Sequence, residues 1–304
     1  MPVLKLKDAE LARNAIMKQQ KKQIEKLYRD AAKEVAQRAQ ALRHRTNISS
    51  TMRVVYLNQL EKQLEAEINK ISTELSNITV SGMTQVSQSV VNNTLSNLKM
   101  LGFNTSGLLS RVPDDVVRSI ATGNVYETGW SLSKRIWGIQ EKTMQDIHTV
   151  VANGIAQNKS AYDIAKDLEK YVDPRAAKQW DWSKVYPGTN KKVDYNAQRL
   201  ARTLTQHAFQ QATERTNDPN PFVTGYVWHS AFAHGRTCIE CMDRDGTFFP
   251  KGEVPMDHPQ GLCTILPQVG ESLTSVANRI ADWNEAEEGT YPEIDAYYEW
   301  MQRN

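Results

Sequence analysis

The residues best suited to chemistry are the three cysteines of the chain, which all lie between positions 238 and 263. With one histidine they form the spacing C-x2-C-x16-H-x4-C, made of Cys238, Cys241, His258 and Cys263. A C-x2-C turn lets two thiolates bind one ion, and a distant histidine and cysteine complete a tetrahedral zinc site. Four protein ligands leave no position open for an activated water. The spacing therefore predicts a structural zinc ion.

Other interpretations of this segment stay open. The thiols can be buried small hydrophobic groups, with His258 as an ordinary loop residue. His229 and His234 are reserve ligands if His258 points away. Asp257 and His258 beside a C-x2-C turn also resemble the opening of an HNH-type metal nuclease. Such a site needs a later asparagine and histidine, and no histidine follows His258. We therefore expect no catalytic residues, and we expect replacement of Asp257 to be nearly silent provided that His258 remains oriented.

Charge is distributed unevenly along the 304 residues, although the net charge is only +2. Residues 1–53 carry a net charge of +8, whereas residues 270–304 carry −6. A basic end suits DNA phosphates or an acidic protein surface, and it is also typical of a solvated helix face. The chain has no apolar run long enough for a membrane span and no apolar stretch near its start. We expect a soluble protein in a reducing compartment.

The elements that must position the cysteine segment are mainly helices. No glycine or proline occurs over residues 3–81, which predicts two long antiparallel helical arms with a break at residues 47–51. Glycines at positions 82, 102 and 107 predict a looser stretch. Further helices are expected over 131–157, 160–172, 196–216, 273–288 and 291–301, with a loop at 175–195 and short strands at 222–230 and 247–249.

The apolar positions repeat at the spacing of three and four that marks one helix face. This stripe comprises Ile24, Tyr28, Ala31, Val35 and Leu42 on the first arm, and Leu57, Leu60, Leu64, Ile68, Ile71, Leu75 and Ile78 on the second. We predict a mainly α fold: a long N-terminal helical hairpin, a helical middle, a small β and zinc-knuckle region, and an acidic helical C-terminus. The predicted domains are residues 1–110, 111–268 and 269–304.

The order of motifs over about residues 110–268 resembles the phage head morphogenesis or minor head protein family of the Mu F type. The matching features are SLSKRIW, SAYDIAKDL and RLARTLTQHAFQQA, then a strand with a tryptophan, RTCIECMDRDG, and DHP followed by a cysteine. Family members often have a further cysteine three residues after the histidine. This chain has Gly261 there, which leaves Cys263 as the only downstream thiol.

The resemblance implies a low-copy virion protein of a tailed phage, located in the head at the portal vertex and assembled in the host cytoplasm. Such a protein assists head assembly and DNA packaging or ejection by a structural role. Its expected partners are the portal protein, the major capsid or scaffolding protein, and phage DNA bound without sequence specificity, with no membrane involved. The alternative from another class is a zinc-stabilised nucleic-acid-binding protein or an HNH-like metal nuclease.

Overall fold

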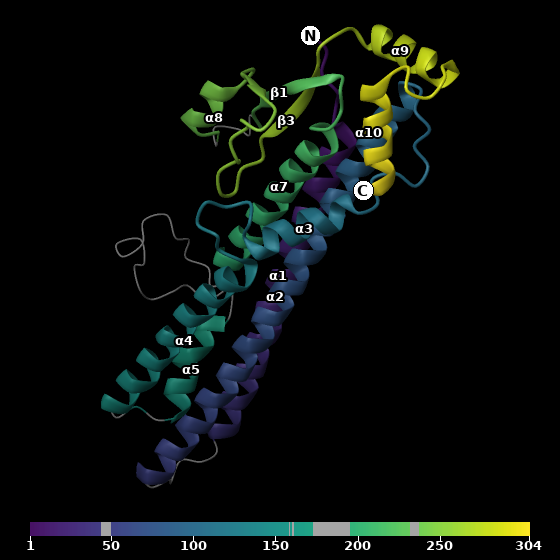
Figure 1. The fold of residues 1–304 in the computed structure, drawn as a ribbon. Coiled ribbons are helices and arrows are strands. Elements are labelled where there is room, and N and C mark those ends of the chain that lie inside the picture. The colour runs from purple at the N-terminus through teal and green to yellow at the C-terminus, as the bar shows by residue number, and fades with distance from the viewer. Residues whose placement is uncertain (44–49, 158, 160, 173–194, 232–236) are drawn as a thin grey trace. The chain divides into compact units, whose positions relative to one another are not determined.

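The computed structural model describes residues 1–43, 50–157, 159, 161–172, 195–231 and 237–304, and it is mainly helical (Figure 1). Its helices are α1 (Lys7–Arg43), α2 (Ser50–Met100), α3 (Val112–Thr122), α4 (Leu132–Ala156), α5 (Ala161–Val172), α7 (Tyr195–Asn217), α8 (Ile239–Arg244), α9 (Leu273–Glu285) and α10 (Pro292–Arg303). Its strands are β1 (Val223–His229), β2 (Phe248–Pro250) and β3 (Thr264–Val269). The predicted fold class is confirmed. No helix among the described residues is long and apolar enough to cross a membrane.

The chain forms two compact units, each assembled from separate stretches of sequence. The first, here called the sheet unit, comprises Met1–Met17, Val80–Glu127 and Arg202–Asn304. The second, the arm unit, comprises Lys18–Thr79 and Thr128–Ala201. This grouping follows contacts in space, whereas the predicted division into residues 1–110, 111–268 and 269–304 follows the order of the chain and stays a prediction.

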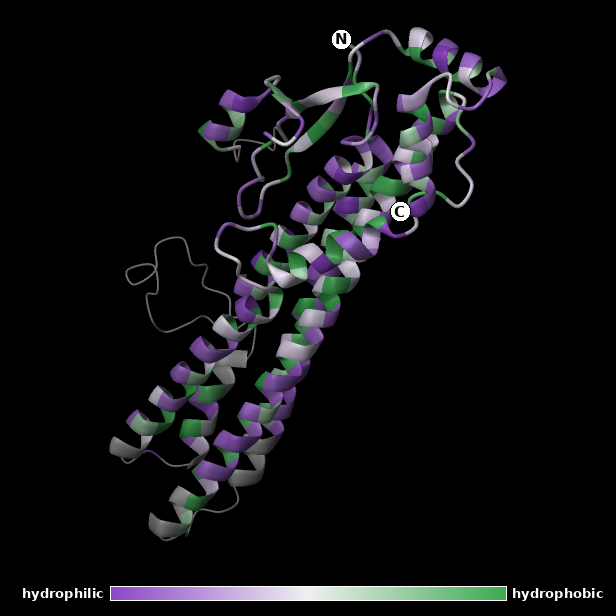
Figure 2. Cartoon of the chain, in the orientation of Figure 1, coloured by the Kyte–Doolittle hydropathy of each residue, from purple (hydrophilic) through white to green (hydrophobic). Residues whose placement is uncertain are grey.

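The arm unit is built on the predicted apolar stripes. On α1 and α2 the stripe residues are buried, except that Ile78 is only half-buried, while hydrophilic residues interleave with them along the helices (Figure 2). The side chain of Leu42, the cap at Ser160, the loop at 175–194 and most of the break at 47–51 lie outside the described residues. Gly154 of α4 lies so close to Ile164 of α5 that an added Cβ would lie 2.4 Å from that side chain. The glycine therefore permits the two helices to approach closely.

The sequence predicted a looser stretch from Gly82 onward, and this prediction is wrong at Gly82. Helix α2 continues through the glycine without a break to Met100. Beyond the glycine the apolar residues Met83, Val86, Val90 and Leu98 are buried, at most 1% exposed. A glycine inside a helix costs about 1 kcal/mol relative to alanine, whereas each fully buried apolar side chain stabilises by about 1.5–3 kcal/mol. Burial of this face therefore outweighs the low helix propensity of one glycine.

The sheet unit contains a three-stranded antiparallel sheet in the order β2-β1-β3. The expected strands at 222–230 and 247–249 correspond to β1 and β2, but β3 was missed by the sequence analysis. Pro267 within β3 lacks a backbone N–H, which restricts such a strand to a sheet edge, and β3 is an edge strand. Residues 2–4 run along its outer side, where Leu4 N–H donates to the carbonyl of Pro267 over 2.8 Å.

Helices α9 and α10 complete the sheet unit through an aromatic cluster. Phe103 is buried, and its ring centroid lies 5.5 Å from that of Trp283 and 6.1 Å from that of Tyr297. The indole N–H of Trp283 donates to Asp295 over 2.7 Å. The acidic C-terminal residues are thus carried by helices whose inner faces are aromatic and packed.

Candidate metal centre

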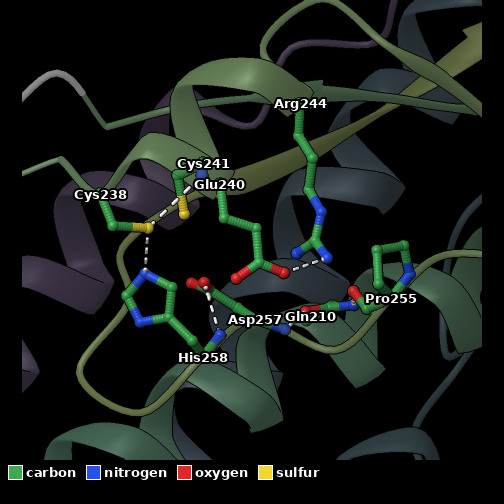
Figure 3. A network of polar contacts seen from close by, with 8 residues as sticks. All are labelled: Gln210, Cys238, Glu240, Cys241, Arg244, Pro255, Asp257 and His258. Carbon is green, nitrogen blue, oxygen red and sulfur yellow. Dashed lines mark hydrogen bonds and ion pairs between the residues drawn. The ribbon is translucent and has the colours of Figure 1, made fainter.

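The first two cysteines are positioned by the short helix α8. Cys238 is its N-cap residue, and its Sγ accepts a hydrogen bond from the backbone N–H of Cys241 over 3.4 Å (Figure 3). This hydrogen bond is the main cause that lowers the pKa of the Cys238 thiol. Burial raises the pKa of Cys241, which is 1% exposed. Capping thus presents one sulfur near the surface and one in the core.

His258 faces this turn in an orientation that suits a metal ligand. Its Nδ1 lies 3.0 Å from the carbonyl oxygen of Pro259, which can only accept a hydrogen bond, so Nδ1 carries the proton. In the neutral ring Nε2 then has the free lone pair, and it lies 3.4 Å from the Sγ of Cys238. Burial lowers the pKa of His258. The hydrogen bond to Pro259, the Asp257 carboxylate and Cys238 together outweigh this effect, so the pKa lies above its ordinary value.

The ligand atoms of the predicted zinc residues form two overlapping groups. The atoms of Cys238, Cys241 and His258 lie within 4.8 Å of one another, and so do those of Cys241, Asp257 and Cys263. Cys241 is common to both, and Cys263 is buried at the start of β3. The structure therefore brings three predicted ligands into one group and connects the fourth through Cys241. All three cysteines are free thiols, and the group can hold a metal ion.

Of the two reserve ligands, His229 has no place in this arrangement. The side chain of His229 is 59% exposed, and its Nδ1 lies 3.9 Å from the carboxylate of Asp245. His234 lies outside the described residues. Among the described histidines, only His258 belongs to a group that can hold a metal ion.

Asp257 organises the loop that carries the last two ligands. Its Oδ1 accepts from the backbone N–H of His258 over 2.8 Å, and its Oδ2 accepts from that of Cys263 over 3.2 Å and from the Gln206 amide over 2.9 Å. The residue is 3% exposed, and burial raises the pKa of its carboxyl group. Replacement of Asp257 was expected to be nearly silent provided that His258 remains oriented. The structure argues against that condition, because the backbone N–H of His258 and two further donors would lose their acceptor.

Gly261 is explained by the same carboxylate. A Cβ at this position would lie 2.1 Å from Oδ2 of Asp257, closer than side-chain atoms approach. Any side chain here, including the cysteine found in the resembling family, would displace Asp257. The glycine therefore lets the loop between His258 and Cys263 close around the carboxylate.

Helix α7 supplies supporting residues that the sequence analysis did not identify. The Gln206 amide also donates to the carbonyl of Cys263 over 2.6 Å, and Gln210 accepts from the backbone N–H of Asp257 over 3.0 Å. His207 Nε2 lies 2.9 Å from the carbonyl of Asp257, so it carries the proton, and Nδ1 accepts from the hydroxyl of Tyr126. The sequence does contain a pattern that could have identified them. A polar stripe lies at helical spacing beside the apolar stripe of this helix and comprises Thr203, Gln206, Gln210 and Thr213.

Comparisons with protein-family models, with curated proteins and with solved structures found no match for this chain.

Proposed function

We propose that Cys238, Cys241, His258 and Cys263 hold one structural zinc ion. The donor set supports this assignment, since thiolates with one neutral imidazole are the ligands that tetrahedral zinc prefers. The Nδ1–H of His258 is engaged by a backbone carbonyl, as in metal-bound histidines generally. The ion would join α8 to the start of β3 and so stabilise a small sheet. Zinc binding requires His258 and Cys263 to reach the same ion.

Metal content tests the zinc proposal directly. We expect one equivalent of zinc in the purified chain and a lower melting temperature after chelation. His258→Gln should lose the metal, whereas His229→Gln, a matched control in the same unit, should retain it. Far less than one equivalent in the wild type, or unchanged melting after chelation, would exclude the site.

We further propose that the chain is a minor head protein of a tailed phage that acts by position at the portal vertex. The observation that carries the structural role is the state of Asp257. Its carboxylate is buried and accepts three hydrogen bonds that fix the two neighbouring ligand residues, which leaves it committed to the fold. The order of motifs described above supports the assignment to head proteins. We infer that the chain is not an enzyme and assists head assembly and DNA packaging or ejection.

The proposed partners are the portal protein, with the major capsid or scaffolding protein and phage DNA as further contacts inside the head. The basic part of α1 offers a suitable surface, because Lys18, Lys22, Lys26 and Lys33 are all exposed. Such a surface attracts phosphates or acidic protein without sequence specificity and weakens with salt. The location proposed for the assembled protein is the virion, at the portal vertex or in the head interior.

Coexpression with the portal protein of the same phage, followed by size-exclusion chromatography, tests this proposal. We expect coelution, and we expect the variant with all four of these lysines changed to glutamine to coelute less at moderate salt. Deletion of residues 1–53 is unsuitable, because residues 1–17 are part of the sheet unit. Absence of coelution together with metal-dependent cleavage of plasmid DNA that Asp257→Asn abolishes would favour the nuclease alternative instead.

A further inference from the structure

Arg13 of α1 is a buried cation in the sheet unit. It is 4% exposed, and its guanidinium carbon lies 4.6 Å from the ring centroid of Phe209. Its Nη1 donates to Gln206 over 3.0 Å, and lies 3.4 Å from both the carbonyl oxygen of Cys263 and the hydroxyl of Thr264. Its Nε is buried and has no partner among the described residues. Arg13 therefore contacts the residues that surround the third cysteine.

Within the described part of the chain, the hydrogen-bond acceptors of this guanidinium are all neutral. Among the described residues, no carboxylate forms an ion pair with Arg13, although Glu10 and Asp257 act on it electrostatically from farther away. An arginine keeps its charge in proteins, and a buried charge without a countercharge is costly. The position of Arg13 thus calls for negative charge nearby.

The proposed metal centre supplies that charge. Three thiolates and a neutral histidine around a divalent zinc ion carry a net charge of −1. The Asp257 carboxylate, when ionised, adds to it. Cys263 contributes both a metal-ligating sulfur and the carbonyl oxygen that faces Arg13. The positive charge of the Arg13 guanidinium and the negative charge of the metal-loaded centre therefore compensate each other, with Cys263 between them.

Residues 1–17 also hold the strand that starts directly after Cys263. Leu4 N–H donates to the carbonyl of Pro267 over 2.8 Å, and Val269 N–H donates to that of Pro2 over 2.9 Å. Arg13 contacts the beginning of the same strand at Thr264. Residues 1–17 therefore contact the start of β3 through the Arg13 guanidinium and the rest of β3 through backbone hydrogen bonds.

We infer that Arg13 is a positioning residue of the metal centre, and that metal binding and docking of residues 1–17 onto β3 favour each other. The inference rests on the proposed zinc site. Linkage requires the effect to be reciprocal: metal tightens the docked segment, and the docked segment raises metal affinity by the same factor. Loss of the metal would remove the negative charge of the loaded centre from beside Arg13 and so loosen the segment.

Zinc affinity, measured by competition with a chelator, tests one direction of this coupling. Replacement of a group that supports metal ligands typically costs about 10–100-fold in affinity, so we expect Arg13→Met to bind zinc about tenfold more weakly. Arg13→Lys, which keeps the charge without the fork, should recover part of the loss. Lys7→Met removes the same charge from an exposed position of α1 and should leave the affinity unchanged. The visible spectrum of the cobalt-loaded protein should shift in Arg13→Met only.

Amide hydrogen exchange of the wild-type chain tests the other direction without any variant. Removal of zinc should speed exchange at Leu4 and Val269 about tenfold, while the amides of α2 between residues 60 and 75 stay unchanged. A wild type that binds one zinc but shows neither this change nor an affinity loss in Arg13→Met would overturn the inference and leave the metal centre standing. A wild type that binds no zinc would overturn both.

Discussion

The sheet unit and the arm unit are stabilised by different kinds of contact. In the arm unit most buried positions form apolar stripes on long helices, and the ion pair of Lys159 with Asp167 over 2.9 Å is partly exposed. In the sheet unit a buried polar network joins Arg13, Gln206 and Asp257, which are far apart in the sequence. The comparison teaches that repeating local spacing suffices for one unit, whereas the other depends on polar partners that only folding brings together.

The largest effect is expected where the polar network has its centre. Asp257→Ala should lower the free energy of unfolding by about 4 kcal/mol, because three buried donors lose their acceptor. Asp257→Asn keeps a carbonyl oxygen and should cost less. Chemical denaturation of the variants and the wild type at equal metal content measures both. A loss below about 1 kcal/mol in Asp257→Ala, the size of one ordinary hydrogen bond, would remove the network from the comparison.

In the arm unit the corresponding effect should come from an apolar side chain. Leu64 on α2 is fully buried, so Leu64→Ala should cost about 3 kcal/mol through lost burial and the cavity that remains. Lys62→Ala, on an exposed position of the same helix, should change stability by less than about 0.5 kcal/mol. Equal effects of these two changes in denaturation would show that the stripe is not the core of the arm unit.

The stability of the sheet unit should also depend on pH through one buried carboxyl group. Burial raises the pKa of Glu214 on α7 to about 7, from 4.5. Between these values the folded chain keeps a proton that the unfolded chain has lost, so this group's contribution to the free energy of unfolding falls as the pH rises from about 4.5 to 7. The loss reaches at most about 3 kcal/mol.

Glu214→Gln should remove this dependence. The stability of the variant relative to the wild type should therefore be higher at pH 8 than at pH 4, in denaturation curves recorded at both values. A constant difference between the two proteins would mean that Glu214 ionises normally in the folded state.

The smallest effect is expected on the surface of the sheet unit. Glu240 lies between Cys238 and Cys241 in sequence, but its side chain is 63% exposed and pairs with Arg244 over 2.5 Å (Figure 3). Exposed pairs of this type contribute about 0.3–0.5 kcal/mol. Glu240→Ala should leave both the zinc content and the stability nearly unchanged. Loss of metal in this variant would add Glu240 to the ligand candidates and weaken the proposed set.

Helical spacing and short-range motifs carried most of the prediction that could be made from the sequence. The stripes on α1 and α2 were predictable because burial of one helix face repeats every three to four residues. The C-x2-C turn was informative for the same reason, since Cys238 and Cys241 lie within one turn of α8. Strand β3 was missed because it contains Pro267, and a proline weakens any strand signal.

The sequence by itself determined the helical arms, the acidic C-terminal helices and the residue types of a candidate metal centre, because these depend on neighbours within a few positions. Only the tertiary structure decided that Asp257 is a buried acceptor, that Gly261 must lack a side chain, and that Arg13 reaches Cys263 from the other end of the chain. Whether a polar side chain is solvated or buried depends on partners far away in sequence. Periodicity identifies the apolar face of each helix but not the polar groups that another segment will cover.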